Sequence, residues 1–168
     1  HEAVEFEPVV DENGEAVISH YGLPKVKVKE FKAVPLPYFL EGPARMMGYV
    51  DTDTAREMYG KVKETGLYDQ KLAMYKTSAS IEECSMENGR CRAFTPGWQE
   101  RENVFLHMEY KYILAMIKAG LYDEYYETIT RALIPFLDPN MYGRSTLENS
   151  SFLASSANPI EDIHGRGF

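Results

Sequence analysis

The chain has 168 residues, of which 44% are hydrophobic and 12% are aromatic, a composition that suits one domain with a substantial core. Its formal net charge of −8 argues against partners such as nucleic acid or an anionic membrane surface, because phosphate groups require a basic face. No apolar run reaches the roughly 18 residues of a membrane-spanning helix, and the acidic N-terminus lacks the apolar core of a signal peptide.

The first 36 residues carry the pattern of short β-strands. Two apolar runs flank the sequence Asp-Glu-Asn-Gly at 11–14, which is typical of a hairpin turn. Residues 26–31 begin with alternating apolar and charged side chains, the mark of a half-exposed strand. Residues 33–37 should stay extended, because each proline biases the preceding residue away from the helical conformation. Since two or three short strands build no core of their own, we expect residues 1–36 to form an extended β arm.

Helical signals dominate residues 37–168. The sequence Asp51-Thr52-Asp53-Thr54 predicts a helix start, and Gly66 suits the end of the same helix. The most apolar stretch, 104–119, is too long for a strand and has no internal Gly or Pro, so it predicts a buried helix. The expected helices are 38–50, 51–64, 102–119 and 123–134, with mostly irregular segments at 70–93 and 138–168.

Cys84 and Cys91 lie seven positions apart in a polar segment. Their spacing allows a disulfide, but the sequence shows no disulfide framework, and no further residue nearby completes a metal site. We therefore predict reduced thiols in a cytoplasmic protein, without a metal.

A five-residue pattern occurs twice. Thr65-Gly66-Leu67-Tyr68-Asp69 is similar to Ala119-Gly120-Leu121-Tyr122-Asp123, and each copy follows a predicted helix. Repeated helical hairpins of this length suit an α/α toroid, in which inner and outer helices alternate. We therefore expect a mainly α fold, namely a partial (α/α)6 barrel preceded by the short β arm.

Residues 94–107 hold the candidate site. Their first part, Thr95-Pro96-Gly97, predicts a turn, because Pro restricts φ and Gly admits conformations that other residues avoid. The polar run Arg101-Glu102-Asn103 follows, in or just before the first turn of the predicted helix. His107 comes four residues after Asn103, so we expect the two side chains to share a helix face.

This run predicts an anion site at a helix N-terminus, where unpaired N–H groups and positive potential favour negative charge. Arg101 and His107 would add to it, and Glu102 would accept hydrogen bonds from hydroxyl groups. The same residues also fit ordinary helix capping, and a lone histidine on an apolar helix is more often a core residue than a ligand. Both interpretations stay open.

Several segments resemble the cellobiose and chitobiose phosphorylases of glycoside hydrolase family 94. In that family a Pro-Gly turn, a Glu-Asn pair and a His follow one another late in a catalytic (α/α)6 barrel, as Pro96-Gly97, Glu102-Asn103 and His107 do here. From about Phe31 onward the chain is also similar to large bacterial relatives of cellobiose phosphorylase. The segments that carry this similarity are 106–112, 119–123, 142–145 and 155–159.

The resemblance implies inverting phosphorolysis of a β-linked disaccharide or oligosaccharide, with inorganic phosphate as co-substrate and no other cofactor. Phosphate attacks the anomeric carbon while an Asp protonates the leaving oxygen. His107 falls on the family's phosphate-binding histidine, and Glu102 on the glutamate that faces the sugar. We assign phosphate binding to His107 and Arg101, and sugar binding to Glu102 and Trp98. The family's general acid and a downstream Thr have no counterpart, and the two Gly that follow the Asn are missing after Asn103.

We therefore expect residues 1–168 to be one fragment of a larger catalytic domain, with 1–36 as the arm and 37–168 as the barrel portion. The full-length protein would be a glycosyltransferase of carbohydrate metabolism. The fragment alone would be inactive and would associate with the rest of the barrel or with a second copy. The alternative is a non-catalytic helical module that binds a glycan or another protein.

Overall fold

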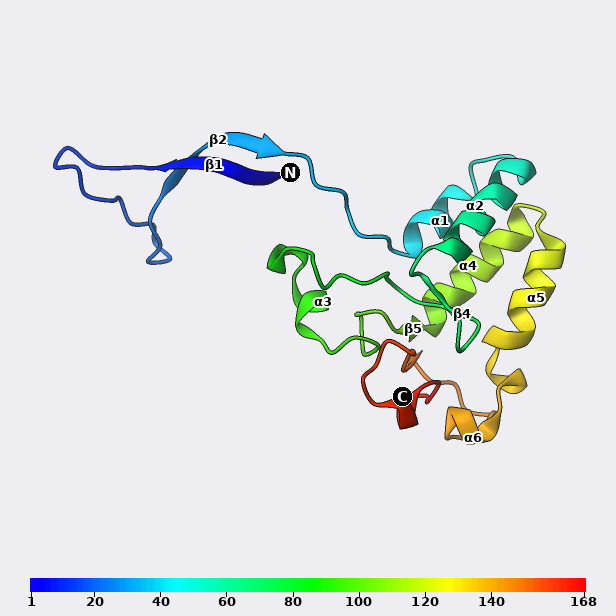
Figure 1. Cartoon of the computed structure of the whole chain (residues 1–168). Coiled ribbons are helices and arrows are strands. Elements are labelled where there is room, and N and C mark those ends of the chain that lie inside the picture. Colours follow the sequence, from blue (N-terminus) through cyan, green and yellow to red (C-terminus); the bar gives the residue numbers. More distant parts are fainter. The chain divides into compact units, whose positions relative to one another are not determined.

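The computed structural model describes residues 1–168, except for the side chain of Glu87. Two compact units divide the chain, His1–Leu36 and Pro37–Phe168 (Figure 1).

The first unit is a two-stranded antiparallel hairpin of β1 (Glu2–Pro8) and β2 (Val26–Lys32). Phe6 lies opposite Val28, and two residues further along the strand Pro8 lies opposite Val26, which makes a second apolar pair. The other face carries charge, with Lys29 Nζ 2.7 Å from Glu7 Oε1. The apolar side chains of this hairpin are largely exposed, because two strands alone enclose no core.

The second unit is built on four longer helices. They are α1 (Glu41–Met46), α2 (Thr52–Glu64), α4 (Leu106–Lys118) and α5 (Tyr122–Ala132). Figure 1 shows them gathered into one group, in which α4 packs against both α1 and α5.

The start of α2 is set by local chemistry. The carboxylate of Asp51 accepts hydrogen bonds from the N–H groups of Asp53 at 3.1 Å and Thr54 at 3.0 Å, which satisfies two backbone donors that a helix start leaves free. At the other end the Thr65 hydroxyl donates to the carbonyl of Val62 at 2.7 Å. The helix predicted at 51–64 is confirmed and is one residue shorter.

Helix α4 begins later than predicted. Val104 and Phe105 form the short strand β5 and pair with β6 (Phe152–Leu153), and the N–H of Leu106 donates to the carbonyl of Ser151 at 3.3 Å. The C-terminal segment therefore takes the hydrogen bonds that a helical turn at 102–105 would have made. The prediction of a helix from 102 is wrong, and so is the shared helix face that followed from it.

Shorter elements fill the rest of the second unit. They are β3 (Tyr68–Asp69), β4 (Met74–Tyr75), α3 (Arg90–Ala93), α6 (Pro139–Tyr142) and the 3₁₀ turns Met86–Asn88, Ile134–Phe136 and Glu161–Ile163. The C-terminal segment is more ordered than its polar composition indicates, since Phe168 donates to the carbonyl of Phe152 at 3.0 Å and accepts from the N–H of Ser151 at 2.8 Å. Cys84 and Cys91 are both free thiols.

Two apolar clusters form the core. The first lies among α1, α2 and α4 and includes the buried rings of Tyr59 and Tyr112. The second joins α4 and α5 to β5, β6 and α6 through residues such as Ile113, Leu153 and Tyr142. Helix α4 contributes to both clusters, because its buried residues cover about half of its circumference.

The expected mainly α fold is wrong. The chain has 35% helix and 19% strand, with three small antiparallel sheets, and is an α+β fold rather than a partial (α/α)6 barrel. The repeated pattern explains the error, because its two copies adopt different structures. Tyr68–Asp69 is strand β3, whereas Tyr122 begins helix α5 just after Gly120, whose φ of +79° ends α4.

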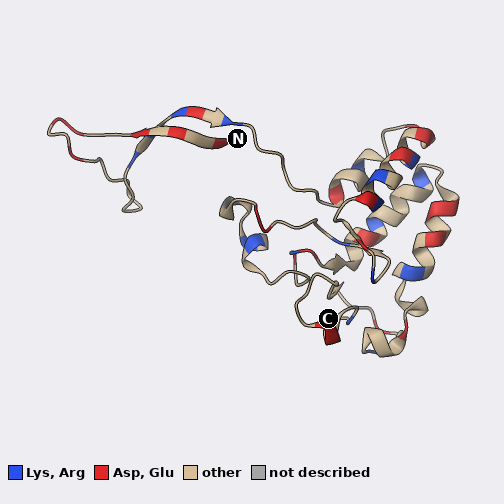
Figure 2. Ribbon diagram, viewed as in Figure 1, with Lys and Arg blue, Asp and Glu red and all other residues tan. Residues whose placement is uncertain are grey.

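Charged side chains of both signs are interspersed along the helices (Figure 2). On α5 the first turn carries Asp123 and Glu124 and the last turn carries Arg131. This order stabilises the helix, because each charge lies near the end of the helix dipole of opposite sign. Within the described part of the chain, every helix is too short or too polar to cross a membrane.

Candidate functional site

The carboxylate of Glu102 lies in a nearly closed environment. Only 6% of the residue is exposed, and its carboxylate oxygens lie 3.9 Å from Lys76 Nζ and 3.8 Å from Arg101 Nε. Both distances allow ion pairs but exceed hydrogen-bond length, and no described residue donates a hydrogen bond to this carboxylate. Burial raises the pKa of Glu102, and the two cations oppose that rise only in part. The acceptor positions of a carboxylate are thus left without donors.

The backbone of Glu102 adopts an uncommon conformation, with a φ of +56°. For a residue other than Gly this region costs about 1–2 kcal/mol. Two serines hold it there: Ser78 Oγ accepts from the N–H of Glu102 at 3.1 Å, and the Ser155 hydroxyl donates to its carbonyl. Beside it, the N–H of Thr77 donates to the carbonyl of Asn103 at 2.7 Å. Strained backbone of this kind concentrates at functional positions.

Arg101 is buried and engaged within the chain. Its Nη1 donates to the carbonyls of Arg92 and Phe94, both at 3.0 Å, and its Nη2 pairs with the carboxylate of Glu82. Nε has no hydrogen-bond partner among the described residues. The guanidinium therefore ties the segment before the turn to the segment after it. Of its five N–H groups, three make these contacts, so the N–H of Nε and one N–H of Nη2 could bind phosphate without breaking a bond inside the chain.

Trp98 packs as an aromatic anchor. Its ring makes edge contacts with Phe152 at 5.1 Å and Phe168 at 4.6 Å between ring centroids, and its backbone exchanges hydrogen bonds with Arg101. The ring joins the turn at 95–97 to the C-terminal segment. Within the described chain the Trp98 side chain forms no hydrogen bond to Glu102.

His107 is exposed in the first turn of α4, with its ring 5.1 Å from the ring of Phe105. It forms no hydrogen bond or ion pair with Arg101 or Glu102 among the described contacts. The structure thus brings together the side chains of two of the four predicted residues, Arg101 and Glu102. Trp98 meets Arg101 through backbone hydrogen bonds, and His107 lies on α4.

Two further ties join the C-terminal segment to the 69–72 loop. Asp69 is buried and accepts from both the N–H and the hydroxyl of Ser156, at 2.7 and 2.8 Å. His164 Nε2 lies 2.7 Å from the carbonyl of Asn158, and His164 Nδ1 lies 2.8 Å from Lys71 Nζ. Because a carbonyl only accepts and an ammonium only donates, Nε2 carries the ring proton.

Sequence reasoning missed most partners of Glu102. Ser155 belongs to a segment that carried the family resemblance, so a signal existed for it. Lys76 and Ser78 lie in the stretch expected to be irregular, where no pattern marked them. Their role follows only from the loop at 74–78 lying beside 101–103.

A second buried carboxyl belongs to α4. Glu109 is fully buried, accepts from the N–H of Tyr75 at 2.8 Å through Oε1, and has no partner at Oε2 among the described residues. Burial, together with the nearby charge of Asp69, raises the pKa of Glu109 to about 8. This carboxyl is therefore mostly protonated at neutral pH in the folded chain.

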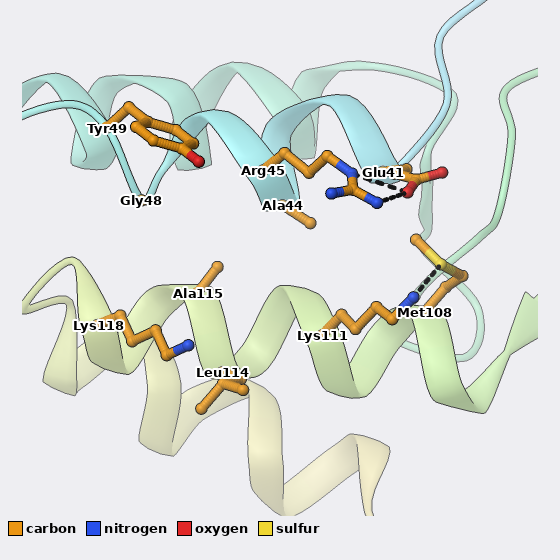
Figure 3. A pocket seen from close by; sticks show the side chains of 10 residues that line it. All are labelled: Glu41, Ala44, Arg45, Gly48, Tyr49, Met108, Lys111, Leu114, Ala115 and Lys118. Atoms are coloured by element: carbon orange, nitrogen blue, oxygen red, sulfur yellow. Dashed lines mark hydrogen bonds and ion pairs between the residues drawn. The ribbon is translucent and has the colours of Figure 1, made fainter.

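A groove of about 480 Å³ runs between α1 and α4, on residues that the sequence did not single out. Figure 3 shows Lys111 and Lys118 extending along it in the same direction, with Glu41 and Arg45 paired on the opposite wall. Its volume lies in the range of ligand-binding clefts.

No protein-family model matches this chain, and no curated protein matches it.

Proposed function

We propose that the chain belongs to a carbohydrate-active protein of the cellobiose phosphorylase type, in which Glu102 binds a β-linked disaccharide or oligosaccharide. The observation that supports this most is the carboxylate of Glu102, which lies near two cations and accepts no hydrogen bond from any described residue. Sugar hydroxyls are donors of the kind that this carboxylate lacks.

The family resemblance adds to this proposal. The Glu102-Asn103 pair and Ser155 come from two separate segments that carry the resemblance, and they meet in one hydrogen-bonded cluster. Lys76 and Arg101 oppose in part the rise of the Glu102 pKa that burial causes, and hydrogen bonds to an ionised carboxylate are stronger than those to a neutral acceptor. Because only 6% of the residue is exposed, a bound sugar would displace part of the surrounding cluster to reach the carboxylate.

The proposed chemistry is inverting phosphorolysis. Inorganic phosphate forms the new bond to the anomeric carbon as the glycosidic bond breaks, and a carboxylic acid supplies the proton to the leaving oxygen. His107 and Arg101 remain the proposed phosphate ligands. No described residue is assigned as the acid, so the chain alone should bind sugar without turning it over.

Binding tests this proposal directly. Cellobiose should perturb the NMR signals of residues around Glu102, and Glu102→Gln should weaken that binding by about 10- to 100-fold, since a hydrogen bond to a charged group contributes roughly 1.5–3 kcal/mol. The matched control is Glu83→Gln, which neutralises an exposed glutamate and should leave binding unchanged.

Phosphate titration separates the two roles. His107→Ala should weaken phosphate binding while leaving cellobiose binding unchanged, and Glu102→Gln should do the reverse. The proposal fails if cellobiose in large excess causes no change, or if Glu102→Gln lowers both affinities equally along with the melting temperature.

A further inference from the structure

The groove between α1 and α4 carries a net positive charge in an acidic chain, because three cations and one carboxylate line it. Arg45 on the α1 wall is neutralised by Glu41, whose carboxylate lies 2.6 Å from its Nη2. On the α4 wall, no described acidic group forms a close ion pair with Lys111 or Lys118. Lys111 Nζ lies 3.9 Å from the sulfur of Met108 and interacts with the Glu41 carboxylate only at longer range. Two ammonium groups without a close ion pair among the described residues therefore line the groove of a protein whose formal net charge is −8.

Apolar surface lies between these two lysines. Lys111, Leu114, Ala115 and Lys118 occupy helix positions i, i+3, i+4 and i+7, which form one stripe. Leu114 is 49% exposed, and Tyr49 on the α1 wall is 89% exposed. Along its axis, the α4 wall thus presents a cation, an apolar patch and a second cation.

The spacing of this stripe selects a partner. Seven residues of helix advance about 10 Å, so the two ammonium groups stand about two helical turns apart. A second helix repeats the same spacing between its own positions i and i+7. Its carboxylates would then meet both lysines while its i+3 or i+4 side chain covers Leu114.

We propose that this groove binds an acidic amphipathic helix of another protein, with two carboxylates two turns apart and apolar residues between them. Helices laid into apolar grooves are a common mode of recognition. Each exposed ion pair contributes only about 0.2–1 kcal/mol to the binding free energy. The ion pairs therefore set the register of the bound helix and the choice of partner rather than most of the affinity. The apolar contact with Leu114 and Tyr49 supplies the remaining affinity.

A designed peptide of about 18 residues provides the probe. It is alanine-based, with Glu at i and i+7 and Leu at i+3 and i+4, and the matched peptide has Gln in place of both Glu. Fluorescence anisotropy with the full chain should show tighter binding of the Glu peptide, weakened by salt. Lys111→Glu and Lys118→Glu should each weaken it about tenfold, because repulsion replaces attraction, whereas Lys61→Glu on α2 should not.

A charge swap gives the sharpest result. The double variant Lys111→Glu/Lys118→Glu should bind a peptide with Lys at i and i+7 better than the Glu peptide. Both lysines are exposed, and unchanged melting curves would show that the variants stay folded. Equal binding of the Glu and Gln peptides, or indifference to both lysine variants, would overturn the proposal. Self-association of the chain that Lys118→Glu abolishes would assign the groove to a second copy, and would overturn it as well.

Discussion

Replacing Glu109 by Gln should remove a large part of the pH dependence of stability. In the folded chain burial raises the pKa of Glu109 to about 8, whereas the ordinary value is 4.5. Gln keeps an oxygen that can accept from the N–H of Tyr75, a bond that is 2.8 Å long in the structure. It changes the size of the side chain little and cannot ionise.

The magnitude follows from the pKa difference. Each pKa unit corresponds to about 1.4 kcal/mol, so full ionisation of Glu109 costs the folded state about 5 kcal/mol. Because the folded-state pKa is the higher one, the stabilising contribution is complete below pH 4.5 and is lost as pH rises through 8. Between pH 5 and pH 8 the free energy of unfolding should fall by about 3–4 kcal/mol through this residue alone.

Urea unfolding at several pH values measures the effect. Glu109→Gln should unfold with nearly the wild-type free energy at pH 5, and with a free energy about 3 kcal/mol higher at pH 8. The exposed Glu83 offers a matched Glu→Gln control, which should leave the pH slope unchanged. If Glu109→Gln shows the wild-type slope, the buried carboxyl does not titrate as its surroundings require, and the reasoning is refuted.

Three further substitutions test the packing and the hydrogen bonds of the second unit. Gly167→Ala should destabilise the chain by about 2 kcal/mol, because the new Cβ would lie 2.2 Å from Tyr142 Cε2 and 2.3 Å from Ser150 Oγ. Gly60→Ala, in open space on α2, should instead stabilise it by about 0.5–1 kcal/mol. Equal effects of the two substitutions in thermal melts would contradict this account. Arg101→Ala should lower the free energy of unfolding by about 3 kcal/mol, because two carbonyls and a carboxylate lose the guanidinium that donates to them. A loss below about 1 kcal/mol in urea titrations would show that these contacts contribute little to stability.

Sequence reasoning correctly located the features that depend only on residues close together in the sequence. The cap of α2 at Asp51 and the turn at 95–97 are of this kind. Gly97 has a φ of +71°, as such a turn requires, and a Cβ there would lie 2.4 Å from the backbone nitrogen of Asn158. The turn thus followed from the sequence, while the close contact that makes Gly necessary did not, because Asn158 lies far along the chain.

The fold class was mispredicted because distant pairing overrode local preference. Val104 and Phe105 belong to an apolar run that predicts a helix, yet β6 takes their hydrogen bonds. Likewise, the two copies of the repeated pattern became a strand at 68–69 and a helix start at 122. For Val104 and Phe105 the decisive backbone partner lies outside any window in which helical or strand periodicity can be read, whereas the strand at 68–69 pairs with the nearby strand at 74–75.

The sequence likewise predicted one part of the candidate site, and the tertiary structure decided the rest. The sequence by itself named Arg101 and Glu102 as chemically important, because two oppositely charged residues beside an apolar run stand out. Only the tertiary structure buried both of them, placed Lys76 and Ser155 against Glu102, and left its carboxylate without a donor. The strength and direction of each electrostatic effect depend on how much water burial removes and on which charges it brings near, and the folded arrangement of loops from distant parts of the chain decides both.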